Sequence, residues 1–156
     1  MNKKILFVCL GNICRSPAAD EIFRARVREI GKEDNYEIDS AGTYGGHAGE
    51  LPDARMRGAA FNRGYKLRHI SRPVKPKDFE DFDMIIAMDD SNYENLFRMA
   101  GTLEERDKIY RMTDFSSQKE YNYIPDPYYE GQDGFGLVLD LLEDACKGLL
   151  EYTEGR

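Results

Sequence analysis

The sequence has few of the residues that build disulfide frameworks and metal sites. It contains three cysteines (Cys9, Cys14 and Cys146) without a Cys-x-x-Cys pair, and two histidines (His47 and His69) that lie in no ligand-like cluster. Disulfide-stapled domains need paired cysteines, and zinc sites repeat their ligands at short spacing. We therefore expect no disulfide framework, no metal and no other cofactor.

Long apolar runs and an excess of positive charge are also absent. No segment approaches the roughly 20 apolar residues of a membrane span, and the short apolar run near the N-terminus lacks a signal-peptide cleavage site. Acidic residues outnumber basic ones by 29 to 22, which disfavours a nucleic-acid partner. We expect one globular domain over residues 1–156, cytoplasmic and monomeric, with neither nucleic acid nor membrane as a partner.

The segment at residues 5–19, ILFVCLGNICRSPAA, is the most informative part of the chain. Its apolar start predicts a buried strand that ends at Cys9, and Ser16 and Pro17 suit the N-cap and first position of a helix. The turn between them begins with Cys9 and ends with Arg15. A strand, a tight loop and a helix N-terminus in this order form a binding site for an anion.

Three further strands are predicted, at residues 36–40, at the continuously apolar residues 84–88, and at the weaker segment 108–112. Helical segments separate the strands and follow the last one. Buried strands that alternate with helices predict an α/β fold with a parallel sheet covered by helices on both faces. The helices are predicted at residues 16–30, 52–63, 76–82, 91–100 and 134–149.

Polar residues lie at the ends of all four predicted strands. Cys9 ends the first strand, Ser40 ends the second, Asp89 follows the third and Asp126 follows the fourth. Ligands of parallel sheets bind at the carboxyl ends of the strands. We therefore expect these side chains to converge on one edge of the sheet, where Asp89 would help to organise Arg15.

The loop between Cys9 and Arg15 has the chemistry of a nucleophilic site. The thiolate rather than the thiol is the nucleophile, and inward backbone N–H groups, the positive helix end and Arg15 would stabilise it. The Ser16 hydroxyl can donate to the sulfur, and Gly11 and Asn12 suit a loop that turns through positive φ. The residues between the cysteine and the arginine are Leu10, Gly11, Asn12, Ile13 and Cys14.

A phosphate monoester fits the same loop. Arg15 can bind two non-bridging oxygens, and in-line attack by Cys9 would give a phosphocysteine that water hydrolyses. The leaving group then needs a proton from a carboxylic acid outside the loop. Asp126 is the candidate, because it lies between two prolines and beside Tyr128 and Tyr129, which could wall an aromatic leaving group.

Four segments resemble the low-molecular-weight protein tyrosine phosphatases: VCLGNICRSP (8–17), DSAGT (39–43), AMDDSN (87–92) and DPYY (126–129). The resemblance covers nearly the whole chain in order. It implies a flavodoxin-like sheet of four parallel strands in the order 2-1-3-4. It also implies an enzyme that hydrolyses phosphotyrosine in protein substrates, with a cognate tyrosine kinase as one candidate substrate.

The resemblance further implies roles for individual residues. Cys9 would be the nucleophile, Arg15 the phosphate clamp and Asp126 the general acid. Cys14 would form a reversible disulfide with Cys9 and protect it from overoxidation. The hydrogen-bond network that shapes the loop would comprise Asn12, Ser16, Ser40 and His69.

The loop after the second strand departs from the family pattern. Many eukaryotic relatives carry a tryptophan there, but this chain has no tryptophan, and Tyr44 is the candidate to replace it as a wall of the substrate groove. Members that act on phosphoarginine tend to carry threonine at the position of Ile13. Ile13 therefore favours phosphotyrosine as the substrate.

Two other functions are open on the sequence alone. Arsenate reductases share this fold and the Cys-x5-Arg loop, but they need two further cysteines downstream, and none lies between Cys14 and Cys146. A non-catalytic phosphate- or phosphotyrosine-binding module would have lost the nucleophile or the acid, whereas Cys9 and Asp126 are both present. The candidate residues also have purely structural explanations. Cys14 could be a packing residue of the loop, and Asp126 could be a turn or helix-capping residue.

Overall fold

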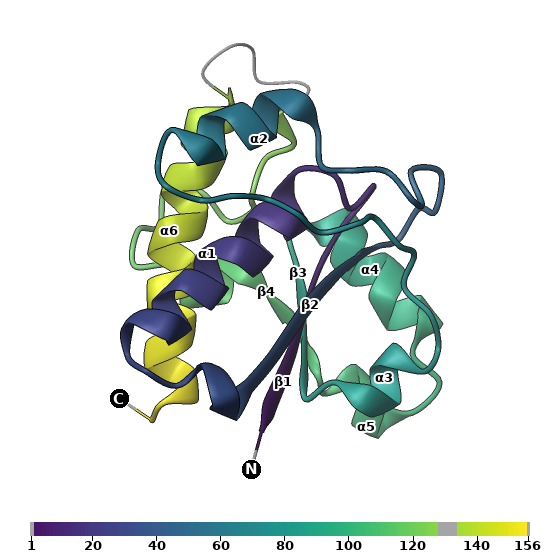
Figure 1. Cartoon of the computed structure of the whole chain (residues 1–156). Helices are drawn as coiled ribbons and strands as arrows, with labels where there is room; N and C mark the ends of the chain where they lie inside the picture. The colour runs from purple at the N-terminus through teal and green to yellow at the C-terminus, as the bar shows by residue number, and fades with distance from the viewer. Residues whose placement is uncertain (1, 128–133, 156) are drawn as a thin grey trace.

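Four parallel strands form the sheet on which the site is built (Figure 1). The structure, a computed structural model, describes residues 2–127 and 134–155 and places the strands in the order β2-β1-β3-β4. The α/β class and the 2-1-3-4 order expected from the sequence are therefore confirmed. The strands are β1 (Lys3–Cys9), β2 (Tyr36–Gly42), β3 (Met84–Ala87) and β4 (Ile109–Arg111).

Helices pack on both faces of this sheet (Figure 1). Side chains of α1, α2 and α6 share one hydrophobic core with the sheet, and side chains of α3 and α4 share the other. The short elements α5, η1 and η2 lie in the connections between strands and helices. The bounds are α1 (Arg15–Glu29), η1 (Glu33–Asn35), α2 (Ala54–Phe61), α3 (Asp78–Asp81), α4 (Asp90–Met99), α5 (Leu103–Arg106), η2 (Met112–Phe115) and α6 (Gly134–Thr153).

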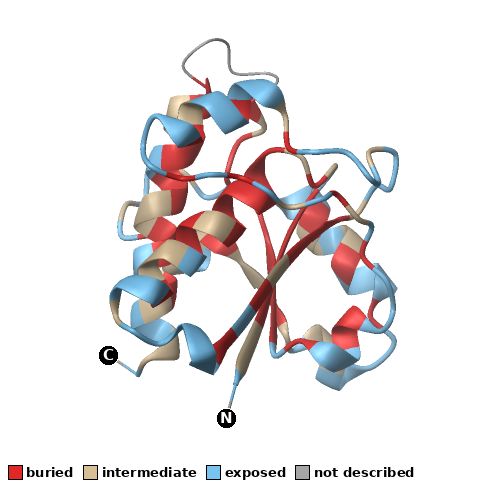
Figure 2. Ribbon diagram, in the orientation of Figure 1, coloured by how far each residue is buried: buried red, intermediate tan, exposed pale blue. Residues whose placement is uncertain are grey.

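Alternate residues of β1 enter the two cores. Ile5 and Phe7 face α1, α2 and α6, whereas Leu6 and Val8 face α3 and α4, and all four side chains are fully buried. Figure 2 colours most of β1 as buried. Successive side chains of a strand point to opposite faces, so burial on both faces requires a continuous apolar run. The run therefore fixes β1 in the centre of the sheet and places Cys9 at its carboxyl end.

Several element boundaries differ from those predicted. α1 begins at Arg15, and Ser16 lies in its first turn without capping it, because the hydroxyl bonds to loop side chains instead. β2 continues past Ser40 to Gly42. The elements α5, η1 and η2 were not predicted, because three or four residues are too short to show helical periodicity. The glycine expected after α1 is confirmed, since Gly31 has a φ of 70°.

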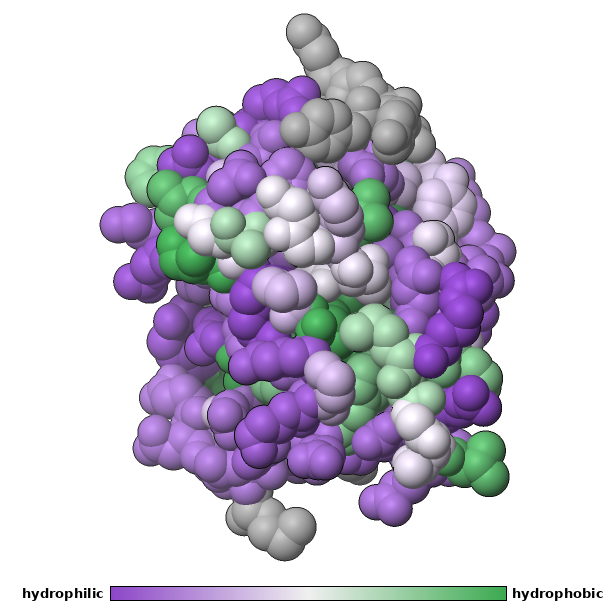
Figure 3. Space-filling model, turned by 90° about the vertical axis from the view of Figure 1, so that its right-hand side faces the viewer, coloured by the Kyte–Doolittle hydropathy of each residue, from purple (hydrophilic) through white to green (hydrophobic). Residues whose placement is uncertain are grey.

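The side of the molecule that carries α3, α4 and α5 is mainly hydrophilic, with small separate apolar patches (Figure 3). On α4 and α5, Phe97, Met99 and Leu103 are exposed. Over the ranges that the structure describes, no helix combines the length and the apolar composition that crossing a membrane requires.

Candidate active site

The loop between β1 and α1 is held against the end of β2. Cys9 pairs with Gly42, and the backbone N–H groups of Thr43 and Tyr44 donate to the carbonyls of Cys9 (3.0 Å) and Leu10 (2.8 Å). A Cβ atom at Gly42 would lie only 2.7 Å from the Leu10 carbonyl oxygen. Because only glycine allows this approach, the end of β2 helps to determine where the cysteine lies.

The Cys9 sulfur is surrounded by donors at the start of α1. Its side chain is buried, and Sγ lies 3.0 Å from the Ser16 hydroxyl and 3.5 Å from the Ser16 backbone nitrogen. The same hydroxyl oxygen accepts from Asn12 Nδ2 at 2.7 Å, which leaves its hydrogen available for the sulfur. Hydrogen-bond donors at the positive end of a helix favour a thiolate over a thiol.

Asn12 is the central residue of the loop. It is fully buried and has a φ of 57°, which asparagine tolerates better than most residues. Its Nδ2 donates to the hydroxyls of Ser16 (2.7 Å) and Ser40 (3.0 Å). Its Oδ1 accepts from the Arg72 backbone N–H at 3.0 Å and lies 2.9 Å from His69 Nε2. The structure thus brings together the four residues expected to form the network.

Segments that follow β2 support the remainder of the loop. The Ser71 hydroxyl donates to the Gly11 carbonyl at 3.0 Å, and the Asp53 N–H donates to the Ile13 carbonyl at 2.7 Å. Gly11 does not adopt a positive φ, so this part of the prediction is wrong and Asn12 alone carries the turn. A Cβ atom at Gly11 would instead lie 3.0 Å from His47 Cδ2, so the glycine makes room for the imidazole.

The Arg15 guanidinium is buried at the other end of the loop. Its Nη1 donates to Asp89 Oδ2 at 2.7 Å and to the Ile124 carbonyl at 2.9 Å, and its Nη2 lies 3.9 Å from Asp126 Oδ2. Burial acts to lower the pKa of Arg15, but the negative groups around it, first Cys9 and then the two carboxylates, raise the pKa overall. A charged guanidinium held in this way can bind an oxyanion through two hydrogen bonds.

The two carboxylates reach Arg15 from different elements. Asp89 is the N-cap of α4, where its Oδ1 accepts a backbone N–H and its Oδ2 bonds to Arg15. Asp126 lies on the segment before α6, and the Ile124 N–H attaches this segment to the Met88 carbonyl after β3, at 2.8 Å. The Asp126 side chain is 26% exposed, so it can meet a bound substrate.

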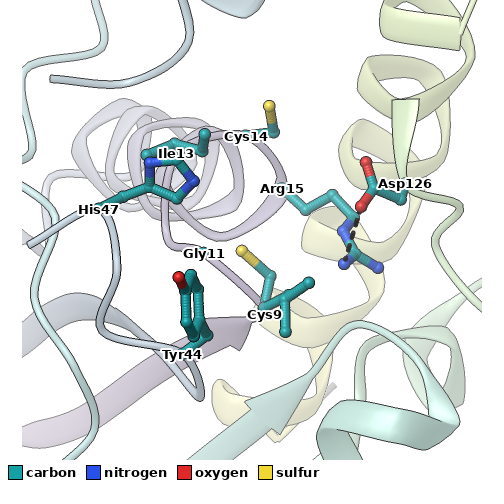
Figure 4. A pocket seen from close by; sticks show the side chains of 9 residues that line it. Cys9, Gly11, Ile13, Cys14, Arg15, Tyr44, His47 and Asp126 are labelled. Carbon is teal, nitrogen blue, oxygen red and sulfur yellow. Dashed lines mark ion pairs between the residues drawn. The ribbon is translucent and has the colours of Figure 1, made fainter. Parts of the chain in front are cut away.

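Cys9, Arg15 and Asp126 line one pocket of about 220 Å³. Figure 4 shows Cys9 in its middle, with Arg15 and Asp126 on one side and Tyr44 and His47 on the other. A thiol, a fixed cation and a carboxyl group around one cavity can bind and cleave a phosphate ester. The other lining residues are Leu10, Gly11, Ile13 and Cys14.

Tyr44 and His47 form an aromatic wall of this pocket. Their rings pack edge to face with centroids 6.2 Å apart, and His47 Nδ1 lies 2.9 Å from Glu50 Oε2. A Cβ atom at Gly46 would come within 2.2 Å of the Tyr44 ring. Glycine at this position therefore lets Tyr44 take the wall position expected of it.

Cys14 also lines the pocket, but its chemistry differs from that of Cys9. Burial raises the pKa of the Cys14 thiol, and the nearby Asp53 and Cys9 raise it further. Cys14 is therefore a neutral thiol at physiological pH. Both cysteines are free, so the loop carries two thiols in different surroundings.

Two residues near the loop, His47 and Arg72, carried no signal in the sequence. His47 lines the pocket, and Arg72 joins the Asn12 network while its guanidinium binds Asp39 at 3.0 Å and a buried carboxylate on α3. These contacts join segments distant in the chain, so no local spacing predicts them. The predicted groove residues Tyr128 and Tyr129 lie outside the described residues.

Comparison with known proteins assigns this fold and pocket to a family. A sequence model of the low molecular weight phosphotyrosine protein phosphatases matches residues 4–154. The chain belongs to this family. The low molecular weight phosphotyrosine protein phosphatase of Schizosaccharomyces pombe is 41% identical over 151 residues, which cover 96% of each chain.

Solved structures of similar phosphatases agree with this assignment. A protein tyrosine phosphatase from Entamoeba histolytica, with Hepes in its active site, is 44% identical and has a TM-score of 0.94 over 99% of each chain. The structure of a Drosophila arginine phosphatase is 35% identical, with a TM-score of 0.90 over 97% of this chain and 98% of that one.

Membership of the low molecular weight phosphotyrosine phosphatases confirms that the chain is an enzyme of a phosphatase family. The family's substrate class is phosphotyrosine-containing proteins. The assignment favours a phosphatase over the arsenate reductase and the non-catalytic binding module.

Proposed function

We propose that the phosphatase hydrolyses phosphotyrosine in two steps through a phosphocysteine at Cys9. The observation that carries the proposal is the single pocket in which Cys9, Arg15 and Asp126 meet. Asp126 is more than a hundred residues from the loop in the sequence, yet its carboxylate lies 3.9 Å from the Arg15 guanidinium. The pocket therefore supplies a nucleophile, an anion-binding cation and a proton donor together.

In the first step, the Cys9 thiolate attacks the phosphorus atom of the bound phosphotyrosine. The sulfur–phosphorus bond forms as the phosphorus–oxygen bond to the phenol breaks, and Asp126 gives its proton to the departing oxygen. Arg15 and the loop N–H groups bind the non-bridging oxygens, on which the negative charge remains.

In the second step, water attacks the phosphocysteine. Asp126, now a carboxylate, takes a proton from the water as the new oxygen–phosphorus bond forms and the sulfur–phosphorus bond breaks. The Ser16 hydroxyl, 3.0 Å from the sulfur, donates to the departing thiolate. The step releases inorganic phosphate and returns Cys9 and Asp126 to their starting protonation states.

The other predicted site residues act by positioning these groups. Asn12, together with Ser40 and His69, orients the Ser16 hydroxyl through the buried network. Asp89 holds the Arg15 guanidinium at 2.7 Å, where its free edge can turn to the phosphate.

Substrate choice depends on the rim of the pocket. Ile13 and the Tyr44 ring supply apolar surface, which suits the phenyl ring of phosphotyrosine. A guanidinium leaving group, as in phosphoarginine, would gain less from that surface. Because one structural relative is an arginine phosphatase, phosphoarginine is the informative competing substrate.

Hydrolysis of an aryl phosphate by three forms of the enzyme tests the proposal. We expect Cys9→Ser to lose all measurable turnover, because a serine hydroxyl is a much weaker nucleophile than a thiolate. Cys146→Ala is the matched control, since Cys146 is buried in α6 and does not line the pocket. Retained turnover in Cys9→Ser would remove the basis of the mechanism.

Three expectations from the sequence stay predictions. They are the cytoplasmic location, the monomeric state and a cognate tyrosine kinase as substrate.

A further inference from the structure

A second cluster of reactive side chains lies on the far side of the Asn12 network. One ligand atom each from Asp20 on α1, Asp39 on β2 and His69 lie within 4.8 Å of one another. None of the three lines the pocket that holds Cys9. The cluster is therefore a separate feature that touches the phosphate loop through Asn12.

The hydrogen bonds of Asn12 fix which nitrogen of His69 carries a hydrogen. Asn12 Oδ1 accepts from the Arg72 backbone N–H, which can only donate, so the atom that faces His69 is the amide oxygen. His69 Nε2, 2.9 Å away, must then be the donor. In the neutral ring, the lone pair therefore resides on Nδ1.

This lone pair faces another acceptor. His69 Nδ1 lies 3.5 Å from Asp39 Oδ1. Two acceptors face each other favourably only when a cation lies between them, either a proton on the ring or a metal ion. The Asp39 carboxylate keeps its other oxygen on the Arg72 guanidinium. Its Oδ1 accepts the Ser40 backbone N–H at 2.8 Å, and the second lone pair of this oxygen is available to such a cation.

Asp20 provides an independent observation that points to a cation. Its side chain is only 4% exposed, and its Oδ1 accepts from Arg24, but its Oδ2 is a buried oxygen without a hydrogen-bond partner. Buried polar atoms normally have partners, and a cation in the cluster would supply one.

We propose that Asp20, Asp39 and His69 bind a divalent first-row metal ion, with zinc as the best match. One imidazole nitrogen and two carboxylate oxygens form a donor set that zinc uses in proteins. Neighbouring groups already orient the proposed ligands. Asn12 accepts from the other ring nitrogen of His69, and Arg24 and Arg72 donate to the two carboxylates.

The proposed metal site is open on one side, and nearby positive charge lowers its affinity for the ion. A hollow of about 340 Å³, lined by Asp20, Glu21 and His69 among others, gives water and the ion access. Three arginines, Arg24, Arg28 and Arg68, also line this hollow, and their positive charge opposes a cation. We therefore expect weaker binding than at a closed structural zinc site.

The proposal departs from the expectation, drawn from the sequence, of no metal site. That expectation was based on the absence of ligands at short spacing, whereas Asp20, Asp39 and His69 come from three separate segments. Zinc at His69 Nδ1 would fix the tautomer that donates to Asn12, so the ion would support the conformation of the phosphate loop.

The test is zinc titration by calorimetry of the full chain carrying Cys9→Ser, which removes the reactive thiolate as a competing ligand. We expect one ion per chain. Adding Asp20→Asn should weaken binding at least about tenfold, since loss of even a second-shell partner costs 10–100-fold. Adding Asp140→Asn, which changes a well-exposed carboxylate on α6, should leave binding unchanged.

Two further measurements test the proposed zinc site without the Asp20 variant. Nitrogen NMR of the two histidine rings in the Cys9→Ser chain should show zinc shifting Nδ1 of His69 while His47 stays unchanged. Cobalt in place of zinc should give d–d absorption without a thiolate charge-transfer band. The proposal is overturned if no ion binds, if Asp20→Asn binds equally well, if a thiolate band appears, or if His69 responds to pH but not to zinc.

Discussion

The buried amide of Asn12 gives the sharpest test of how the loop is held. Asn12→Ala removes the side chain that bonds to Ser16, Ser40 and the Arg72 backbone and that meets His69. It also leaves an alanine at a φ of 57°, where the left-handed conformation costs an ordinary residue about 1–2 kcal/mol.

The magnitude follows from these two effects. Each buried polar group left without a partner costs about 1–3 kcal/mol, and some of the four partners can turn to other groups or to water. We therefore expect Asn12→Ala to lower the free energy of unfolding by ~3–5 kcal/mol. Asn12→Gly loses the same hydrogen bonds but tolerates the backbone, so it should be ~1–2 kcal/mol more stable than Asn12→Ala.

Chemical denaturation measures the stability of both variants, and hydrolysis of an aryl phosphate measures their activity. The glycine variant should recover part of the stability but little of the activity, because the Ser16 hydroxyl is no longer oriented toward the Cys9 sulfur. The reasoning is refuted if Asn12→Ala changes stability by less than ~1 kcal/mol, or if Asn12→Gly is the less stable of the two.

Three further predictions concern other groups. Asp126→Ala should lower kcat for phosphotyrosine by roughly 10²–10⁴-fold with a much smaller change in binding, whereas equal loss of both would indicate a structural aspartate. Cys14→Ser should recover less activity than the wild type when thiol follows peroxide treatment, because the Cys9 sulfenic acid has lost its disulfide partner; equal recovery would contradict the protective role. Hydrogen bonds from Lys32 and Tyr36 lower the pKa of Glu154 from 4.5 to about 2, so its stabilisation is present above pH 4.5 and is lost as the pH falls toward 2. The stability difference between wild type and Glu154→Gln should therefore shrink over that interval, and a constant difference would argue against these bonds.

The sheet could be predicted because its strands are buried on both faces. β1 and β3 are continuously apolar in the sequence, and the structure shows their residues divided between two cores. The error at Ser16 has a physical cause: the hydroxyl can bond to a backbone N–H or to loop side chains. The Asn12 amide and the Cys9 sulfur offer the second choice.

The site could be predicted where a local motif or the sheet topology places its residues. Cys9 and Arg15 share one loop, and parallel topology brings Asp126 to the same edge of the sheet. The clamp of Arg72 on Asp39 arises from packing between distant segments. The approach of Asp39 to His69 also arises from such packing, and the spacing of these residues in the sequence does not predict it.

Direct detection of the phosphocysteine tests the central claim of the mechanism. Asp126→Ala, mixed with an aryl phosphate whose acidic phenol leaves without a proton, should pass the first step and stall at the second. Rapid acid-free quenching and mass spectrometry of its peptides should then show one phosphoryl group on Cys9. The account is contradicted if turnover proceeds while Cys9 remains unmodified, or if the phosphoryl group is found on another residue.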